Sequence, residues 1–184
     1  VGVDGGALIG GVNDAAVRRR LDALWRMESP KLLARLARIT GNIDTAEELA
    51  QDVLVGALER WPREGVPDNP AAWLMTAAKH RAIDHVRQRQ LHARKQDEYG
   101  IGLTLHGADM QGDDAQRFAD DDIGDDLLRL LFASCHPALP MESRVALTLR
   151  MLGGVSTPEI ARAFLQQEAT AAQRVVRATR TLGE

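Results

Sequence analysis

The segment from Asp44 to Trp61, DTAEELAQDVLVGALERW, constrains the fold more than any other part of the chain. Its apolar residues recur at i, i+3, i+4 and i+7, the spacing that gathers side chains on one face of an α-helix. They are Ala46, Leu49, Ala50, Val53, Leu54, Ala57, Leu58 and Trp61. Asp44 and Glu47 form a pair similar to a capping box, which predicts that the helix starts at this point.

The opposite side of this helix is acidic. It carries Glu48, Asp52 and Glu59, with Glu47 and Gln51 at its borders. The residues alone favour a solvated surface, because charged faces of amphipathic helices usually point to water.

Most of the remaining chain repeats the helical pattern, and few β-branched runs interrupt its Ala, Leu and Arg stretches. Asn13 is a suitable N-cap for one helix, and Ser29 followed by Pro30 is a suitable start for the next, which ends at Gly41. The further predicted helices cover 69–95, 139–154, 156–165 and 170–182. The sequence therefore predicts an all-α fold.

Charge divides the chain into parts. Between Lys79 and Lys95 there are six Lys and Arg and one acid, whereas 96–126 holds ten Asp and Glu and one Arg. The acidic stretch has glycines and poor periodicity, which is typical of a flexible linker. We therefore expect two small helical domains joined by this linker. The predicted boundaries are a disordered lead-in at 1–12, a first domain at 13–95, the linker at 96–121 and a second domain at 122–184.

The predicted helix at 69–95 is strongly basic, although the chain has a formal net charge of −3. Screening over about 8 Å makes a partner respond to this local charge more than to the total. At 100° per residue, the residues predicted to pack inward are Leu74, Met75, Ala78, Ala82, Ile83 and Val86. The residues on the other side are Trp73, Thr76, His80, Asp84 and Arg87.

Trp73 on this polar side has two interpretations. Its ring can simply cover the neighbouring Pro70. Alternatively, it is a platform for unpaired bases, worth about 1–3 kcal/mol per base, while Arg and Lys follow the phosphates.

The C-terminal part has helix–turn–helix spacing. Ser156 and Glu159 form a capping box at the first helix, and a turn at 165–169 leads to the second. The residues of the second helix predicted to point outward are Thr170, Gln173, Arg174, Arg177, Arg180 and Thr181, and those predicted to point inward are Ala172, Val175, Thr179 and Leu182. Arg can pair with guanine and Gln with adenine in the major groove. A solvated basic face on a bundle helix is the alternative.

Several classes are excluded by what the sequence lacks. The single cysteine, Cys135, rules out an internal disulfide and suits a reducing cytoplasm. No apolar run reaches the roughly 20 residues that span a bilayer, and the start lacks a signal-peptide pattern. Cys135 and His136 have no metal-ligand spacing partner, so we expect a buried cysteine before the turn at Pro137. We predict no catalytic residue, no metal and no cofactor.

Four stretches, in order from about Val12 to Leu182, resemble the bacterial extracytoplasmic-function (ECF) sigma factors of the sigma-70 family. Similarity to conserved regions 2.1 and 2.2 lies in RLARITGNIDTAEELAQDVLVGALERW, and similarity to regions 2.3 and 2.4 lies in NPAAWLMTAAKHRAIDHVRQR. Region 4.1 is similar to DDLLRLLFASCHPALPMESRVALTLRMLGGVS, and region 4.2 to TPEIARAFLQQEATAAQRVVRATRTL. The resemblance implies a region 2 helical bundle and a region 4 helix–turn–helix.

The resemblance also implies partners. Family members meet the basic clamp helices on the largest subunit of core RNA polymerase through a surface that corresponds here to Glu47, Glu48, Gln51 and Asp52. The flap of the second-largest subunit and promoter DNA are further implied partners, and an anti-sigma factor or a C-terminal regulatory domain is a possible regulator. The acidic linker corresponds to a segment that threads the polymerase near the RNA exit path. The implied location is cytoplasmic, at the nucleoid when bound to polymerase.

Two sets of residues correspond to the family's promoter contacts. The set for the minus-ten element is Arg63, Asn69, Trp73, Thr76, Lys79, His80, Asp84 and Arg87, with 63–69 as the loop that holds a flipped base. The set for the minus-thirty-five element is Thr170, Gln173, Arg174, Arg177 and Arg180.

Some residues depart from the family pattern. His80 stands where Asn is usual, and Ala172 stands where a Lys is common. The phrases WPREGVPDNPAAWL and FASCHPALP resemble a subgroup with a long appended C-terminal domain. Two rival hypotheses remain, a stand-alone helix–turn–helix regulator of duplex operators and a helical adaptor that binds no nucleic acid. A flexible linker also permits a compact free state that hides both DNA faces.

Overall fold

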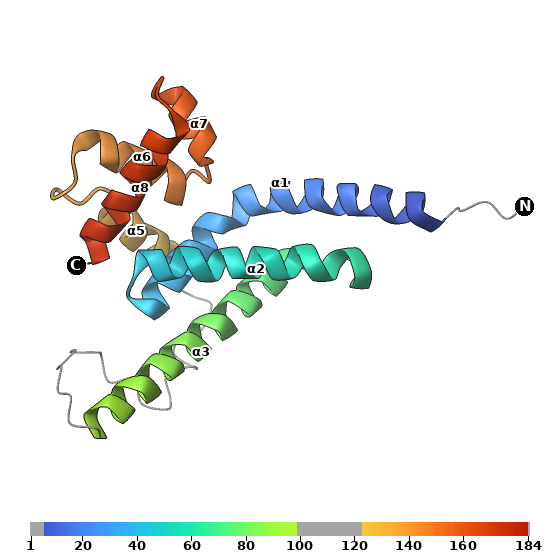
Figure 1. Cartoon of the computed structure of the whole chain (residues 1–184), viewed down its shortest axis with the longest axis horizontal. Coiled ribbons are helices and arrows are strands. Elements are labelled where there is room, and N and C mark those ends of the chain that lie inside the picture. Colours follow the sequence, from blue (N-terminus) through green and yellow to red (C-terminus); the bar gives the residue numbers. More distant parts are fainter. Residues whose placement is uncertain (1–5, 99–122, 184) are drawn as a thin grey trace, which may run out of the picture.

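The computed structural model describes residues 6–98 and 123–183, and within these ranges the regular elements are all helices (Figure 1). The helices are α1 (Gly6–Thr40), α2 (Ile43–Glu64), α3 (Pro70–Glu98), α5 (Ile123–Ser134), α6 (Met141–Met151), α7 (Thr157–Ala163) and α8 (Glu168–Gly183). The all-α fold class is confirmed. We call α1 to α3 the N-terminal half and α5 to α8 the C-terminal half. The predicted lead-in overlaps the start of α1, and most of the predicted linker lies outside the described residues.

Helix α1 corrects two predictions. It begins at Gly6, so Asn13 lies inside the helix and is not its N-cap. The sequence suggested two helices separated at Ser29, but the structure has one helix with Pro30 inside it. Figure 1 shows α1 changing direction near its middle. A proline inside a helix removes one hydrogen bond and crowds the preceding turn, which bends the helix. The buried Ser29, Leu32 and Leu36 around Pro30 keep both parts packed on the core, so the helix bends without ending.

The turn between α1 and α2 uses local signals. Gly41 has φ of 68°, a conformation that glycine adopts without strain, and its N–H donates to the carbonyl of Ala37 at 2.9 Å. Asn42 then caps α2, because its Oδ1 accepts a hydrogen bond from the N–H of Thr45 at 2.9 Å. The prediction that α2 starts with an Asp44 cap was therefore wrong. Asn42 is the residue with the extended backbone that an N-cap needs.

The core of the N-terminal half lies where α1, α2 and α3 meet. Trp61 is only 2% exposed, and Leu74, Ala78 and Ala82 of α3 are fully buried. The inward face predicted for α3 is thus confirmed at its centre, with Met75, Ile83 and Val86 half-buried. This packing fixes the opposite face of α3 toward the surface.

The C-terminal half ends in the predicted helix–turn–helix. The capping box of α7 is present, since the N–H of Ser156 donates to Glu159 Oε2 at 2.9 Å. Leu165 lies in the turn between α7 and α8 with φ of 51°. Helix α8 buries Ala171, Val175, Ala178 and Thr179, while the predicted inward residues Ala172 and Leu182 are half-buried.

The two halves contact each other. Helix α5 packs beside the second part of α1, and α8 lies near the beginning of α2 (Figure 1). Gly154, which has φ of 60°, lies in the turn after α6 against α1. A Cβ on Gly154 would come within 2.8 Å of the carbonyl oxygen of Arg26. The backbones therefore approach closely at this point.

Candidate nucleic-acid and polymerase interfaces

The outer face of α3 carries the polar residues that the sequence predicted for it. Thr76, His80, Asp84 and Arg87 are exposed, whereas Trp73 and Lys79 are half-buried. Trp73, Thr76, His80, Asp84 and Arg87 follow one another at three- and four-residue intervals, so these five form a single stripe along the helix, with Lys79 at its border. This stripe has the hydrogen-bonding groups and the charge that a nucleic-acid surface needs.

Trp73 belongs partly to the core. Its ring lies at 5.5 Å from that of Trp61, centroid to centroid, with an angle of 70° between the planes. Edge-to-face contacts of this kind stabilise aromatic pairs by about 0.5–1.5 kcal/mol. The half-buried ring is therefore held in one orientation, with part of its surface left open at the beginning of α3. A fixed ring is a better stacking platform than a mobile one, because less side-chain entropy is lost on binding.

Asn69 has a structural role in addition to the predicted one. Its Oδ1 accepts a hydrogen bond from the N–H of Ala72 at 3.1 Å, and Pro70 is the first residue of α3. Asn69 is therefore the N-cap of the helix. Because Oδ1 serves as the cap, the N–H groups of the Asn69 side-chain amide are the donors that this side chain can offer to a ligand. Arg63, at the end of α2, is exposed nearby in sequence.

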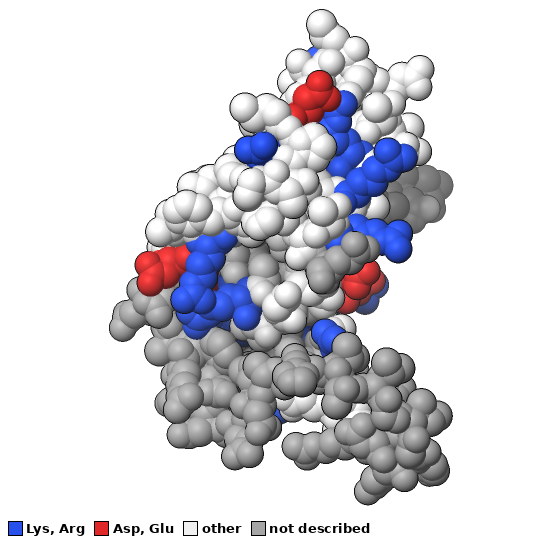
Figure 2. Space-filling model, turned by 90° about the vertical axis from the view of Figure 1, so that its left-hand side faces the viewer, with Lys and Arg blue, Asp and Glu red and all other residues white. Residues whose placement is uncertain are grey.

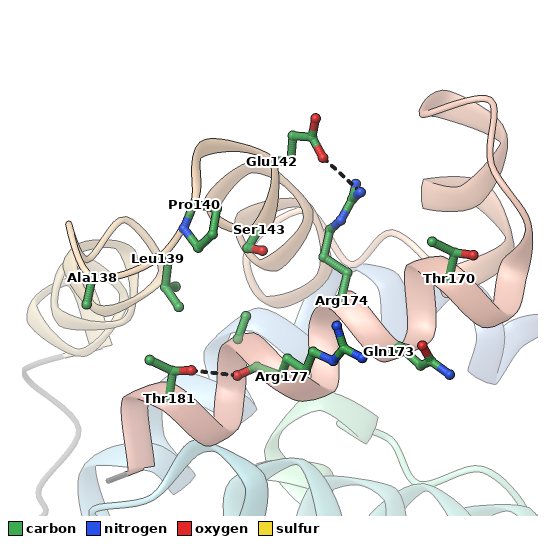
Figure 3. Close-up of a pocket in the computed structure, with 11 residues that line it drawn as sticks. Ala138, Leu139, Pro140, Glu142, Ser143, Thr170, Gln173, Arg174, Arg177 and Thr181 are labelled. Atoms are coloured by element: carbon green, nitrogen blue, oxygen red, sulfur yellow. Dashed lines mark hydrogen bonds and ion pairs between the residues drawn. The ribbon is translucent and has the colours of Figure 1, made fainter.

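Four of the five predicted minus-thirty-five residues border one hollow of about 440 Å³ between α6 and α8 (Figure 3). They are Thr170, Gln173, Arg174 and Arg177. The fifth, Arg180, borders a different hollow, together with Glu47 and Gln51 of α2. The structure thus brings together the first four residues and turns Arg180 toward the N-terminal half.

Arg174 differs from its neighbours on α8. Its Nη2 lies 2.8 Å from Glu142 Oε2, and its side chain is only 21% exposed (Figure 3). Its guanidinium also lies 5.5 Å from the centre of the Phe164 ring. Gln173 and Arg177 are exposed and have no such anchor. Arg174 therefore joins α8 to α6 and α7, and no local spacing in the sequence reveals the contact with Glu142.

Basic side chains gather on the C-terminal half. Figure 2 shows Lys and Arg in groups on the face turned to the viewer, including one over the upper part of the molecule, where α6, α7 and α8 lie in Figure 1. One acidic group lies directly against the upper end of that basic group. Such a surface attracts the phosphates of DNA without sequence preference, and groove contacts then add specificity.

The capping carboxylate of α7 has a lowered pKa. The hydrogen bonds from the side chain and the backbone N–H of Ser156 are the largest causes, and the positive charges of Arg26 and Arg162 add to them. These contacts hold the pKa of Glu159 below its usual value of 4.5. Its contribution to stability is therefore complete above pH 4.5 and is lost as the pH falls through the folded-state pKa.

Glu159→Gln is expected to lower the unfolding temperature near neutral pH, with a difference from wild type that disappears in acid. The reason is that only the wild-type carboxylate is neutralised as the pH falls. Thermal unfolding at a series of pH values from 7 to 3 measures this difference. Glu59→Gln is a suitable control, because Glu59 is exposed on α2 far from the first turn of that helix. A difference that stayed constant into acid would contradict the assignment.

The predicted polymerase-binding residues lie on the outer side of α2. Glu48, Gln51 and Asp52 are exposed, and Asp52 Oδ2 lies 3.6 Å from Arg81 Nη1 of α3. Glu47 is different, because its Oε1 lies 3.3 Å from Nε of Arg150 in the C-terminal half. The first part of this acidic face is thus occupied by the molecule's own α6.

Cys135 is exposed and unpaired, so the expectation of a buried cysteine was wrong. Cys135 directly follows the last residue of α5, and the turn there leaves its side chain exposed to solvent. Its Sγ lies 3.7 Å from Oγ1 of Thr148 in α6. Within 6–98 and 123–183, no group of three or more His, Cys, Asp or Glu is placed to hold a metal ion. Among the helices described there, none combines the length and apolar character of a membrane span.

Comparison with known proteins agrees with this arrangement. The model of sigma-70 region 2 matches residues 24–92, and that of sigma-70 region 4 matches residues 129–182. ECF RNA polymerase sigma factor SigK of Mycobacterium ulcerans (strain Agy99) is 26% identical over 80% of this chain and 75% of its own length. SigK of Mycobacterium tuberculosis (strain ATCC 25618 / H37Rv) is 29% identical over 82% of this chain and 75% of its own length.

A longer relative is also similar. An uncharacterized protein of Rhizobium meliloti (strain 1021) is 40% identical over 81% of this chain, and the match covers 34% of that protein's length. The chain therefore spans about a third of this relative. With both regions present in order, the chain belongs to the sigma-70 family, in its ECF group, whose members direct transcription initiation.

Proposed function

We propose that the chain binds core RNA polymerase, selects promoters through two DNA-binding faces and opens the strands at the start site. The observation that carries the proposal is the pair of exposed faces on α3 and α8, one in each matched region. The polymerase supplies the bond-making chemistry. The chain supplies the choice of promoter, and it works in the cytoplasm, at the nucleoid when bound to polymerase.

The α3 face would bind the minus-ten element. Trp73 stands at the beginning of the helix, where a displaced base can stack on the open part of its ring, and the loop 63–69 follows α2 directly. His80 and Asp84 offer donors and acceptors, and Arg87 and Lys79 offer positive charge for phosphates. Stacking on an aromatic ring selects unpaired strands, since both faces of a base inside a duplex are already stacked on its neighbours.

The α8 face would bind the minus-thirty-five element as a duplex. Gln173 and Arg177 are exposed on the second helix of a helix–turn–helix, the helix that enters the major groove in such motifs. Thr170, at the beginning of α8, would contact a phosphate. Arg174 would orient the helix through Glu142 and Phe164 in addition to any contact with DNA.

Two further surfaces fit the polymerase. Glu48 and Asp52 would offer negative charge, and Gln51 a neutral amide, to the clamp helices of the largest subunit, which the family resemblance implies are basic. The C-terminal half exposes a group of large apolar side chains on α5 and α6, namely Leu128, Leu131, Phe132, Met141 and Val145. Such a group favours a protein partner, and the flap of the second-largest subunit is the partner proposed for it.

Run-off transcription with purified core polymerase tests the proposal. Core polymerase with the chain should give promoter-dependent transcripts from a genomic promoter library, and core polymerase alone should not. Glu48→Lys should reduce the transcript several-fold by weakening assembly, because it reverses one charge on the face proposed to meet the clamp. Glu59→Lys is the matched control further along α2. If no promoter gave a chain-dependent transcript, the proposal would be wrong.

A further inference from the structure

The two halves are joined by buried charges. Arg35 of α1 is fully buried, and its Nε lies 3.0 Å from Asp126 Oδ2 of α5. Arg38 Nη1 lies 3.1 Å from the other carboxylate oxygen of Asp126. Asp126 has a side-chain exposure of 1%, so one carboxylate is held between two guanidiniums from the other half. We call these three residues the seam cluster.

The contacts of the seam cluster can hold the two halves together and can also be broken when the halves separate. Arg35 Nε and both oxygens of Asp126 lie at ion-pair distance from an opposite charge, but the buried nitrogens of Arg35 and these oxygens make no well-directed hydrogen bond. Buried ion pairs recover their lost hydration only when hydrogen bonds complete them. Separation of the halves would return the charges to water. The closed arrangement is therefore specific but held by a contact that a competitor can break.

The closed arrangement covers the first part of the acidic face of α2, at Glu47, while Glu48, Gln51 and Asp52 stay exposed. Arg150 of α6 lies 3.3 Å from Glu47, and both side chains are about a quarter exposed, at 27% and 24%. Around this pair, Arg150, Val176 and Arg180 of the C-terminal half face Asp44, Glu48 and Gln51 across one hollow. Positive side chains thus stand where the basic clamp helices are proposed to bind. The DNA-facing side chains His80, Arg87, Gln173 and Arg177 stay exposed.

Promoter geometry requires the halves to part. The minus-ten and minus-thirty-five elements are centred about 25 base pairs apart, which is roughly 85 Å of B-DNA at about 3.4 Å per base pair. In the structure, α8 and α2 share one hollow, so the two DNA-binding halves are in direct contact. A chain that binds both elements at once cannot keep this contact.

We propose that the seam cluster is a latch that holds the free chain closed, and that the latched C-terminal half blocks the acidic face of α2 against polymerase. The second part rests on the proposed polymerase face. In this scheme the clamp helices replace Arg150 at Glu47, and opening of Arg35, Arg38 and Asp126 releases α8 toward the upstream element. The sequence permitted a compact free state that hides both DNA faces. In this scheme the closed chain instead masks the polymerase face and leaves both DNA faces exposed.

The latch is tested by the distance between spin labels on the two halves. Labels at Glu59→Cys and Glu168→Cys, in a Cys135→Ser background, report on α2 and α8. We expect one narrow distance distribution in the free chain. Asp126→Ala should shift it to longer and broader distances, whereas Asp125→Ala, an exposed neighbour in the same helical turn, should not. An unchanged distribution in Asp126→Ala would overturn the latch.

Three further variants separate loss of the latch from loss of folding. Arg35→Met with Asp126→Leu replaces the ion pair by apolar side chains, and we expect the chain to stay closed. Arg150→Glu should loosen the seam by repelling Glu47, and Arg150→Glu with Glu47→Arg should restore the narrow distribution. If the double variant gave the same broad distance distribution as Arg150→Glu alone, the Arg150–Glu47 ion pair would not contribute to the closed state.

Affinity for core polymerase tests the masking. If the closed state holds about nine-tenths of the free chain, Asp126→Ala should bind core polymerase about tenfold more tightly. The apolar double variant Arg35→Met with Asp126→Leu should bind no more tightly than wild type. Glu48→Lys in the Asp126→Ala background should weaken binding, because the open chain presents the face directly.

The possible failures are distinguishable. If Asp126→Ala opens the chain without tighter binding while Glu48→Lys still weakens binding, the masking is wrong and the polymerase face stands. If Glu48→Lys has no effect in the open background, the proposed polymerase face is wrong, and the masking with it.

Discussion

Replacement of Arg177 by alanine is expected to weaken binding to a minus-thirty-five duplex by roughly 5- to 100-fold without changing the unfolding temperature. The Arg177 side chain is exposed on α8, and its backbone carbonyl accepts a hydrogen bond from Thr181 Oγ1 at 2.9 Å. A bidentate contact between arginine and a base is worth about 1–3 kcal/mol, and each 1.4 kcal/mol is about tenfold in affinity. Binding of the polymerase complex to duplexes that differ at single positions measures the effect.

Arg174→Ala should behave differently. Its side chain is held by Glu142 and Phe164, so the substitution should lower the unfolding temperature as well as the affinity. Glu142→Gln removes the ion pair while keeping Arg174, and should reproduce part of the stability loss. Arg60→Ala, an exposed position on α2, is a control for charge alone. Equal stability losses in Arg174→Ala and Arg177→Ala would contradict the distinction between them.

Replacement of Trp61 by alanine should lower the free energy of unfolding of the N-terminal half by about 3–5 kcal/mol, the usual cost of deleting a large buried aromatic side chain. Trp61 is 2% exposed at the centre of the packing between α2 and its neighbours. Chemical denaturation, followed by circular dichroism, measures the loss. A loss below about 1 kcal/mol would mean that the core does not depend on this ring.

Trp73→Ala should have a small effect on stability and a large effect on promoter opening, the reverse of Trp61→Ala. It removes an edge-to-face contact worth about 1 kcal/mol in stability, but it also removes the proposed stacking surface. Loss of one stacked base, at about 1–3 kcal/mol, should reduce open-complex formation on a double-stranded promoter by roughly 5- to 100-fold. A template with the minus-ten region already unpaired should reduce this defect. A defect equal on both templates would argue against a role in strand opening.

Local patterns predicted the parts of the structure that depend on local interactions. The capping box of Ser156 and Glu159 is confirmed, because both partners lie within one helical turn. The inward face of α3 is confirmed at Leu74, Ala78 and Ala82, because periodicity alone decides which side of a helix is apolar. The predicted outward residues of α3 are half-buried or exposed for the same reason.

Contacts between residues far apart in the chain could not be predicted from local sequence patterns. Asp126 was one of many acids in a predicted linker and nearby helix, and nothing local distinguishes it as the residue that Arg35 and Arg38 hold. Arg174 was predicted to point outward as its neighbours do, and only the packing of α6 against α8 brings Glu142 to it. The continuity of α1 through Pro30 likewise depends on tertiary packing, which offsets the lost hydrogen bond.

The most direct measurement is a footprint of the open complex formed by this chain with core polymerase on a responsive promoter. Reactivity of unpaired thymines maps the melted region, and nuclease protection maps the upstream duplex. The account predicts open bases at the minus-ten element that are lost in Trp73→Ala, and protection at the minus-thirty-five element that is lost in Arg177→Ala. A complex in which neither region was protected or melted, or in which the two variants left both signals unchanged, would contradict it.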